Sequence, residues 1–167
     1  VMTQRRSVNW SRVLVYGLLP GLALLLAMSA GLLKWKDSSI RGLDLARSQS
    51  VSAAKDSTVA VLTFRSDTVD RDVAAARERL TGGFLDTYKQ RTQQELIPNA
   101  KQRRVIATAS VPAAASESVT ANHAVVLLFV TQTVRIGDAP RADTGSSVRV
   151  TLDKIGERWL ISDFDQY

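Results

Sequence analysis

The chain has 167 residues and no cysteine, and its 22 Lys and Arg against 16 Asp and Glu give a formal net charge of +6. The missing cysteines exclude disulfides, thiolate metal sites and cysteine nucleophiles. Residues 1–37 hold five basic residues and one acid, whereas residues 38–167 hold 17 and 15. Because the larger part is nearly balanced, the basicity indicates contact with anionic membrane lipids near the N-terminus and no nucleic-acid partner.

Residues 13–33 form an uncharged run, VLVYGLLPGLALLLAMSAGLL. As an α-helix this run would rise about 31 Å, the thickness of a bilayer's hydrocarbon core, so it predicts a transmembrane helix. A cleavable signal peptide is the alternative, because residues 27–29 resemble a small-x-small cleavage site, although a secretory apolar region is normally shorter. Four residues that favour the headgroup layer bound the run as membrane-interface anchors: Trp10, Arg12, Lys34 and Trp35.

The arginines at positions 5, 6 and 12 precede the run and favour a cytoplasmic tail, residues 1–12. Residues 34–167 would then form an extracytoplasmic (periplasmic) domain of a single-pass protein of the cell (inner) membrane. Basic residues also follow the run, which makes the charge bias small.

Small residues recur along one side of the predicted membrane helix. Gly17 and Gly21 form a GxxxG motif, and Ala27 and Gly31 continue small residues at a four-residue step. Such faces let a second helix approach closely in lipid, although Gly and Ala are common in membrane helices in any case. The four positions are the predicted packing face for a partner helix.

Helices precede strands in the rest of the chain. Apolar residues at three- and four-residue steps predict a long helix over 39–64. Two shorter helices are predicted over 70–81, where Gly82-Gly83 would stop the helix, and over 84–97, where Pro98 would end it. Alternating apolar residues predict four strands, over 104–111, 123–136, 147–155 and 158–164.

This segregated order predicts an α+β class, with an antiparallel sheet packed against helices. The stretch Pro112–Ala121 is either a weak edge strand or a loop, and Gly137–Ser147 is rich in turn residues. The predicted domain core includes four aromatic residues: Phe84, Tyr88, Trp159 and Phe164.

Three segments resemble a known family. They are the helix VSAAKDSTVAVLTF, the segment Asp70–Tyr88, and the hairpin Val148–Phe164 with its tight turn at Gly156. Together with the anchor they resemble the Mce-associated membrane (Mam) proteins of actinobacteria, which accompany the mammalian-cell-entry (MCE) lipid importers. The resemblance implies a cone-shaped domain like nuclear transport factor 2 (NTF2-like, SnoaL-like or cystatin-like).

The resemblance also implies a role: a non-enzymatic accessory subunit of an MCE-type importer of fatty acids or sterols. The transmembrane helix would dock on the integral-membrane permease, and the soluble domain on MCE-domain subunits. Two alternatives stay open, a scaffold of another cell-envelope complex such as a type IV secretion system, and a cone domain that binds a lipid.

Catalytic chemistry has little support in the sequence. The single histidine, His123, stands at the start of a predicted strand, and the carboxylate pairs 70/72 and 163/165 suit a helix N-terminus and a solvated strand face. No phosphate-binding loop, GxSxG elbow or HExxH motif occurs. The sequence therefore predicts no catalytic, cofactor or metal site.

The topology leads to a first prediction. Protease added to spheroplasts should cut the Gly137–Ser147 segment and spare a tag fused before Val1, because only residues after the span would lie outside. Immunoblots against the tag and against the C-terminal domain measure the two cuts. Protection of Gly137–Ser147 until the spheroplasts are lysed would reverse the topology.

Overall fold

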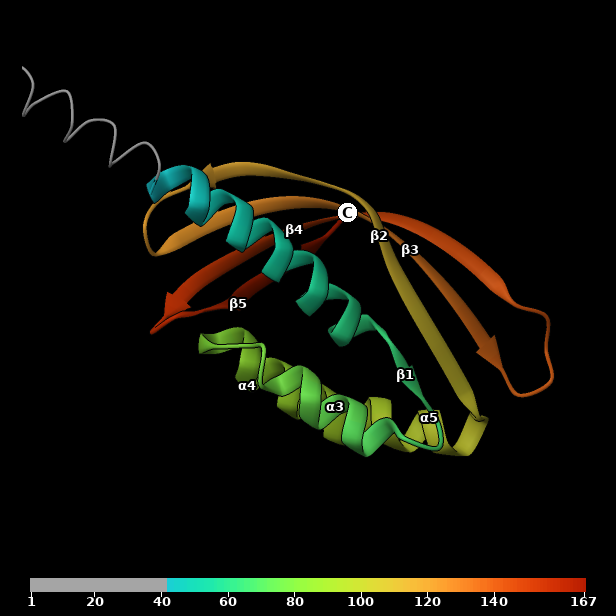
Figure 1. Cartoon of the computed structure of the whole chain (residues 1–167). Coiled ribbons are helices and arrows are strands. Elements are labelled where there is room, and N and C mark those ends of the chain that lie inside the picture. The colour runs from blue at the N-terminus through green and yellow to red at the C-terminus, as the bar shows by residue number, and fades with distance from the viewer. Residues whose placement is uncertain (1–41) are drawn as a thin grey trace, which may run out of the picture. The chain divides into compact units, whose positions relative to one another are not determined.

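The computed structural model describes residues 42–167, which form helices followed by a five-stranded antiparallel sheet (Figure 1). This order confirms the α+β class. The predicted tail 1–12 and membrane span 13–33 lie outside the described residues, as do the predicted packing face and interface anchors. Between residues 42 and 167, no helix is both long and apolar enough to cross a membrane.

The first described helix spans residues 42–62, and the predicted range 39–64 is wrong at its C-terminal end. The chain instead leaves the helix at Thr63 and enters strand β1 (Phe64–Arg65), which pairs with Ala107 and Ile106. Two side-chain contacts favour this exit. The Gln132 Nε2 donates to the Leu62 carbonyl at 3.0 Å, and the Thr63 hydroxyl accepts from the Ala109 amide at 3.0 Å.

Helix α3 (Val69–Arg77) ends four residues before the predicted end at 81. The chain after it forms a short parallel bridge to the sheet, in which Ile161 donates to the Arg79 carbonyl and accepts from the Thr81 amide. Gly82-Gly83 does not stop a helix, contrary to the prediction. Gly82, at a φ of +59° that suits glycine, begins the next helix instead.

The third predicted helix, 84–97, is part of a longer bent segment. It comprises α4 (Gly82–Arg91), a π-helical turn η2 (Thr92–Leu96) and α5 (Ile97–Arg103). The prediction that Pro98 ends the helix is therefore wrong. Pro98 lies in the first turn of α5, and the wider π-turn η2, which ends at Leu96, comes just before it.

The sheet has the strand order β1-β2-β3-β4-β5, and every pair is antiparallel. The four long strands are β2 (Val105–Val119), β3 (His123–Ile136), β4 (Ala142–Ile155) and β5 (Arg158–Gln166). The strand β3 spans the same residues as the predicted strand 123–136. The strand β4 begins five residues before the predicted 147, because Ala142–Ser146 pair with the far end of β3.

The stretch after Pro112, left open between edge strand and loop, is strand through Val119. Pro112 lies where the register of β2 against β3 shifts, between Ser110 and Ala113, and a second shift follows between Ser116 and Ser118. A bulge leaves a residue out of the ladder, so a proline there removes no ladder hydrogen bond. The strand β2 therefore continues through the proline.

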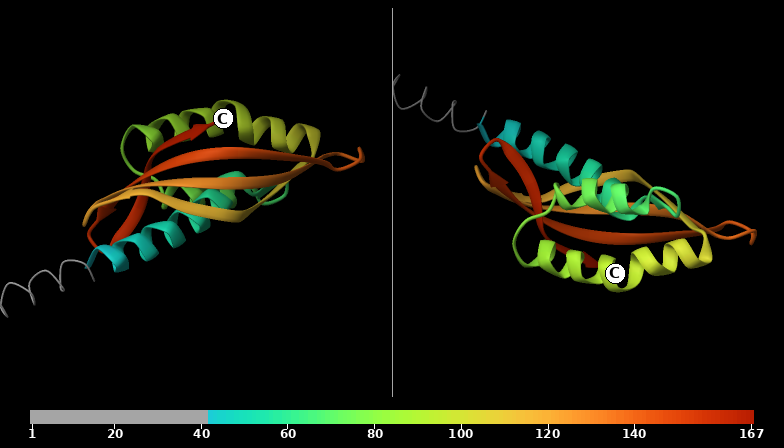
Figure 2. Two further views of the ribbon diagram at one scale, coloured as in Figure 1. Left: turned by 90° about the horizontal axis from the view of Figure 1, so that it is seen from above. Right: turned by 90° about the horizontal axis from the view of Figure 1, so that it is seen from below.

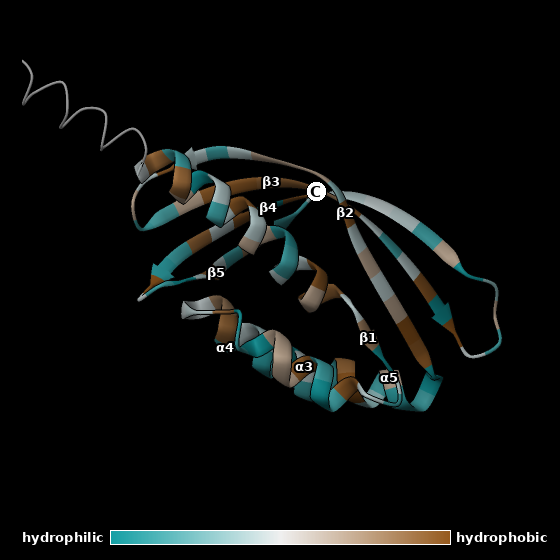
Figure 3. Ribbon diagram, viewed as in Figure 1, coloured by the Kyte–Doolittle hydropathy of each residue, from teal (hydrophilic) through white to brown (hydrophobic). Residues whose placement is uncertain are grey.

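The core lies between helix 42–62 and one face of the sheet. Its strand side consists of alternate residues that are 0% exposed, among them Leu128, Val150 and Ile161. The helix contributes small residues, including Ala54 and Ser50, which are also 0% exposed. Small side chains let the helix backbone approach the sheet closely. Apolar residues are concentrated on β3 and β4 (Figure 3), and Figure 2 shows helix 42–62 along one flank of the strands and α4 to α5 along the other.

A bulge in β5 changes which residues face the helices. Thr151 pairs with Asp163 while the next residue, Leu152, pairs with Ile161, so Ser162 is extra. Strict alternation would put Trp159 and Phe164 on opposite faces. With the bulge, both contact the core, and Asp163 stays exposed.

Trp159 leads to a prediction about stability. Its side chain is 6% exposed, and its indole Nε1–H is buried without a hydrogen-bond partner among the described residues. Trp159→Ala should lower the free energy of unfolding by about 3–5 kcal/mol, whereas Trp159→Phe should cost less because it also removes the unpaired donor. Denaturant melts of the full chain measure both changes.

The matched control is Phe129→Ala, because Phe129 is an aromatic residue of the same sheet that is 59% exposed. Its substitution should change the free energy of unfolding by less than about 1 kcal/mol. Equal losses for Trp159→Ala and Phe129→Ala would contradict the burial of the indole.

Candidate functional site

Three of the four aromatic residues predicted for the core lie together between α4 and β5, while Trp159 is buried apart from them. The rings of Phe84 and Phe164 stack at a centroid distance of 5.6 Å, and Tyr88 lies 6.2 Å from Phe84 at a tilt of 49°. Burial raises the pKa of Tyr88 to about 12. The three rings are partly buried and pack against the core, so this cluster joins α4 to β5.

His123 has a partner that the sequence did not indicate. Its Nδ1 lies 2.7 Å from the Asp153 Oδ1, because the two residues are directly opposite each other on β3 and β4. The side chains are 51% and 39% exposed. Of the carboxylate pairs, Asp70, Asp163 and Asp165 are exposed, and the half-buried Asp72 accepts from the Thr68 hydroxyl. General acid–base catalysis needs one desolvated group, and none of these supplies it.

No metal centre is evident either. Within residues 42–167, no group of three or more His, Asp or Glu side chains is arranged to hold a metal ion.

A groove with a volume of about 700 Å³ lies between helix 42–62 and α3. Its walls carry Arg71, Arg79, Asp56 and Asp72, and the Asp72 carboxylate accepts from the Thr68 hydroxyl at 2.6 Å. Val59, Ala60 and Ala75 line the groove between these charges, so its surface is mixed and does not form an enclosed apolar site for an acyl chain. The concave face of the sheet is itself filled by buried side chains, so neither place favours a lipid-binding cone.

The face of the sheet that turns away from helix 42–62, here called the outer face, carries an apolar stripe along β3. Val125 and Leu127 are half-buried there, and Phe129 is 59% exposed. Above Leu127, the Arg149 guanidinium makes two hydrogen bonds of 3.0 Å to Glu117, which joins β4 to β2 across the middle strand. This bridge covers part of the stripe and leaves Phe129 open.

A second aromatic residue lies near Phe129. Tyr167, 70% exposed, lines a shallow pocket together with Phe129, Gly145 and Ser147. Exposed aromatic residues on a flat surface are the kind that protein interfaces bury. The alternation of the strand predicts that Phe129 lies on the outer face. The proximity of Phe129 to Tyr167 could not be predicted, because it depends on the register of β4.

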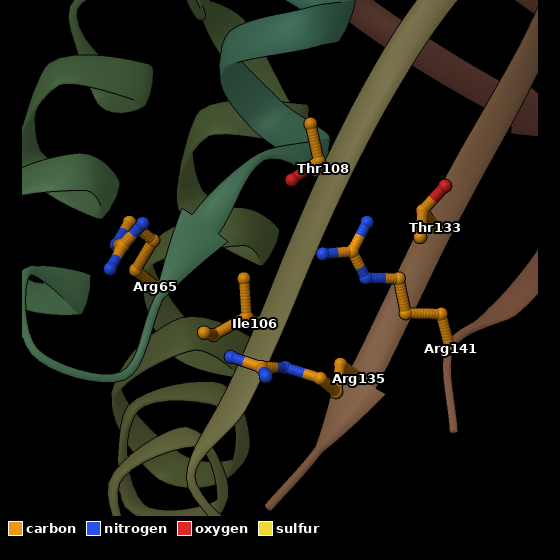
Figure 4. Close-up of a pocket in the computed structure, with 6 residues that line it drawn as sticks. All are labelled: Arg65, Ile106, Thr108, Thr133, Arg135 and Arg141. Atoms are coloured by element: carbon orange, nitrogen blue, oxygen red, sulfur yellow. The ribbon is translucent and has the colours of Figure 1, made fainter. Parts of the chain in front are cut away.

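Three arginines gather at the other end of the outer face, around a pocket of about 350 Å³ that is here called the arginine pocket (Figure 4). The side chains of Arg135 and Arg141 extend from the β3–β4 side toward β2, and Arg65 lies on the β1 side. Ile106, Thr108 and Thr133 complete the lining. No local sequence pattern indicates these residues, because they are up to 76 positions apart and only the strand register brings them together.

The described α+β fold is shared with proteins of type IV secretion systems. An IcmL-like type IV secretion system protein of Legionella pneumophila superposes with a TM-score of 0.62 at 11% identity, over 72% of this chain and 91% of that one. CagV, a VirB8 homologue of the Helicobacter pylori type IV secretion system, superposes with a TM-score of 0.55 at 13% identity, over 70% and 94%. Identities this low establish a shared fold alone.

Residues 18–163 match the family described as uncharacterized protein Rv1363c/MT1408-like, and the chain belongs to that family. Outer membrane protein Rv1973 of Mycobacterium tuberculosis is 55% identical over 158 residues, which are 95% of this chain and 99% of that protein. Neither description mentions MCE importers, so the resemblance to Mam proteins stays a prediction.

The pair His123 and Asp153 leads to a prediction about pH. The hydrogen bond from His123 lowers the pKa of Asp153, against a smaller opposing effect of burial, and a hydrogen bond from Ser162 lowers it further. A carboxylate with a depressed pKa stabilises the fold above its unfolded-state pKa of about 3.9 and loses that contribution as pH falls through the folded-state value. His123→Ala should therefore raise the pKa of Asp153, as measured by carboxyl NMR titration.

The same substitution should lower stability at neutral pH, and the difference from wild type should shrink below about pH 4. Arg91→Gln, which changes an exposed residue of α4, is the control and should leave the Asp153 titration as it is. An unchanged Asp153 titration in His123→Ala would mean that the imidazole does not bond to this carboxylate in solution.

Proposed function

We propose that this chain is a membrane-anchored, non-enzymatic subunit that helps to assemble a multiprotein complex of the cell envelope. The observation that carries the proposal is the fold, which covers 91% of an IcmL-like type IV secretion system protein. The name of the relative at 55% identity, an outer membrane protein, supports a place in the envelope. The uncharged run 13–33 supplies the anchor.

The chemistry of the described residues supports a role without catalysis. The concave face of the sheet is filled by Leu128, Val150 and Ile161, each 0% exposed, so the place where a cone domain could hold a substrate is occupied by the core. The titratable pair His123 and Asp153 is open to solvent. What remains for function is surface, and the outer face offers the aromatic residues Phe129 and Tyr167 to a protein partner.

Two kinds of complex fit this role. A machine related to type IV secretion systems is favoured by the shared fold. A lipid importer, with an integral-membrane permease and MCE-domain subunits as partners, is the narrower reading and rests on the resemblance to Mam proteins. The proteins that co-purify with the full chain from gently solubilised membranes would separate the two.

The membrane that holds the anchor is a further part of the proposal. Three arginines before the run favour the inner membrane with the N-terminus in the cytoplasm, whereas the relative's name refers to the outer membrane. An uncharged helical run of 21 residues suits an inner-membrane span, and the proposal follows the charge pattern. Separation of the two membranes on a density gradient, followed by immunoblotting, tests this assignment.

The anchor is proposed to recognise a membrane partner through its small residues. Gly21→Leu should still insert, because leucine is compatible with hydrocarbon, but it should lose co-purification with the partner since the larger side chain forces the two helices apart. Leu25→Ile, a change of shape without added volume, is the matched control and should retain the partner. Quantitative mass spectrometry of the co-purified proteins measures both.

Ala27 and Gly31 are enlarged in a separate variant, because a four-residue step turns about 400° and the small face drifts round the helix. If both enlarged variants retain their partners at wild-type levels, the anchor is a simple tether. Recognition would then have to lie in residues 38–167. Absence of any stoichiometric partner from the wild-type chain would overturn the proposed function itself.

A further inference from the structure

The arginine pocket is built by strand register. Arg65 lies opposite Ile106 on β2, and Ile106 lies opposite Arg135 on β3, so the three side chains form one row on the outer face. Arg141 directly precedes Ala142, the residue of β4 that pairs with Val134, and therefore extends the row to a fourth strand. The next row holds Thr108, Thr133 and Asp143.

The positive charge of the pocket is largely unmatched. Among the residues that the structure describes, no carboxylate lies within 4.0 Å of Arg135 or Arg141. The nearby acids have other partners. Asp67 pairs with Arg65 at 3.2 Å, and Asp143 accepts from the Thr133 hydroxyl at 2.6 Å.

The simplest interpretation of these arginines is a solvated row at the end of the sheet, since exposed charges also keep strand edges from pairing. Two features of the arginines are not explained by that interpretation. Neighbouring like charges on adjacent strands destabilise a sheet, so placing Arg135 beside Arg141 costs stability unless an anion lies between them. The side chains of Arg135 and Arg141 also extend toward the same stretch of β2 and line one pocket with Thr108, whereas solvated charges would point apart.

We propose that the arginine pocket binds the phosphate group of a small organic phosphate monoester. A carboxylate has one negative charge and two oxygens, which a single guanidinium satisfies bidentately. A phosphate monoester has nearly two negative charges and three strong acceptor oxygens, which match several guanidinium groups that approach from different sides. Arg135 and Arg141 supply the charge-assisted donors and Thr108 a hydroxyl beside them, while Arg65, paired with Asp67, lies at the β1 edge of the pocket.

The volume of the pocket indicates that the phosphate group belongs to a larger organic molecule. A volume of about 350 Å³ corresponds to roughly a dozen waters at ~30 Å³ each, several times the size of one phosphate. Ile106 and the aliphatic stems of the arginines supply apolar surface for the remaining part of the ligand. The same chemistry fits a soluble phosphate ester and the head group of a lipid that ends in a phosphate monoester.

The test uses the full chain in an uncharged detergent, with glycerol 3-phosphate as the soluble probe at constant ionic strength. The side-chain Nε–Hε NMR signals of Arg135 and Arg141 should shift saturably, with a dissociation constant in the millimolar range or below. The double variant Arg135→Gln/Arg141→Gln should weaken binding about tenfold or more, because two charge-assisted donors are lost. The exposed Arg91→Gln removes one charge from α4 and should change affinity by less than about twofold.

Two further probes fix the ligand class and its source. Acetate should bind about tenfold more weakly than glycerol 3-phosphate if the pocket selects a phosphate. Dioctanoyl phosphatidic acid carries the same phosphate on a lipid, and shifts of the arginine signals with this probe in the micelle would assign the site to a lipid head group. Shifts with glycerol 3-phosphate alone would assign it to a soluble ester.

Three results would overturn the proposal: no saturable shift up to about 20 mM of either phosphate probe, binding of acetate as tight as that of glycerol 3-phosphate, or equal affinities of the double variant and Arg91→Gln. The remaining backbone signals of the double variant report whether it is folded. The proposal does not depend on the partners of the chain, so its failure leaves the proposed envelope function untouched.

Discussion

Close contact between helix 42–62 and the concave face of the sheet is the constraint on which the rest of the domain depends. The helix presents small residues to the sheet, and Ala54, Ser50 and Thr58 are all 0% exposed. The Ser50 hydroxyl donates to the Arg47 carbonyl at 3.1 Å, whereas the buried Thr58 hydroxyl has no hydrogen-bond partner among the described residues. A larger residue at these positions would push the helix off the sheet and open the core. Because helix 42–62 packs into the concave face, binding features are to be sought on the outer face of the sheet.

The register of the strands decides what those surfaces carry. A shift by one residue would exchange the inner and outer faces of a strand, so every outer-face feature depends on the bulges that adjust the register. The extra residue in β5 lets Phe164 stack on Phe84, and the bulge between Ser116 and Ser118 lies where Glu117 reaches across β3 to Arg149. The bulges are thus part of how this chain arranges both its core and its exposed ion pair.

The sequence allowed the order of elements and the α+β class to be predicted, because hydrophobic periodicity is a local property that each element carries by itself. The structure nevertheless differs wherever a tertiary contact overrides a local signal. Gly82 begins a helix because the preceding residues bridge to Ile161, and Pro98 is tolerated because a π-turn comes before it. The arginine pocket could not be predicted at all, since no local pattern links Arg65 to Arg135.

The low sequence identity to proteins of the same fold separates the residues that the fold requires from the residues that are specific to this chain. A fold shared at 11% identity needs only a pattern of buried and exposed positions, which many sequences satisfy. Residues on the outer face are not required by that pattern, because any polar side chain would keep the sheet soluble there. Phe129, exposed on the middle strand, and the unmatched pair Arg135 and Arg141 are each less favourable for stability than a small polar residue would be. Positions that cost stability without serving the fold are where binding is to be sought, and here the aromatic residue and the arginines mark two separate surfaces of one sheet.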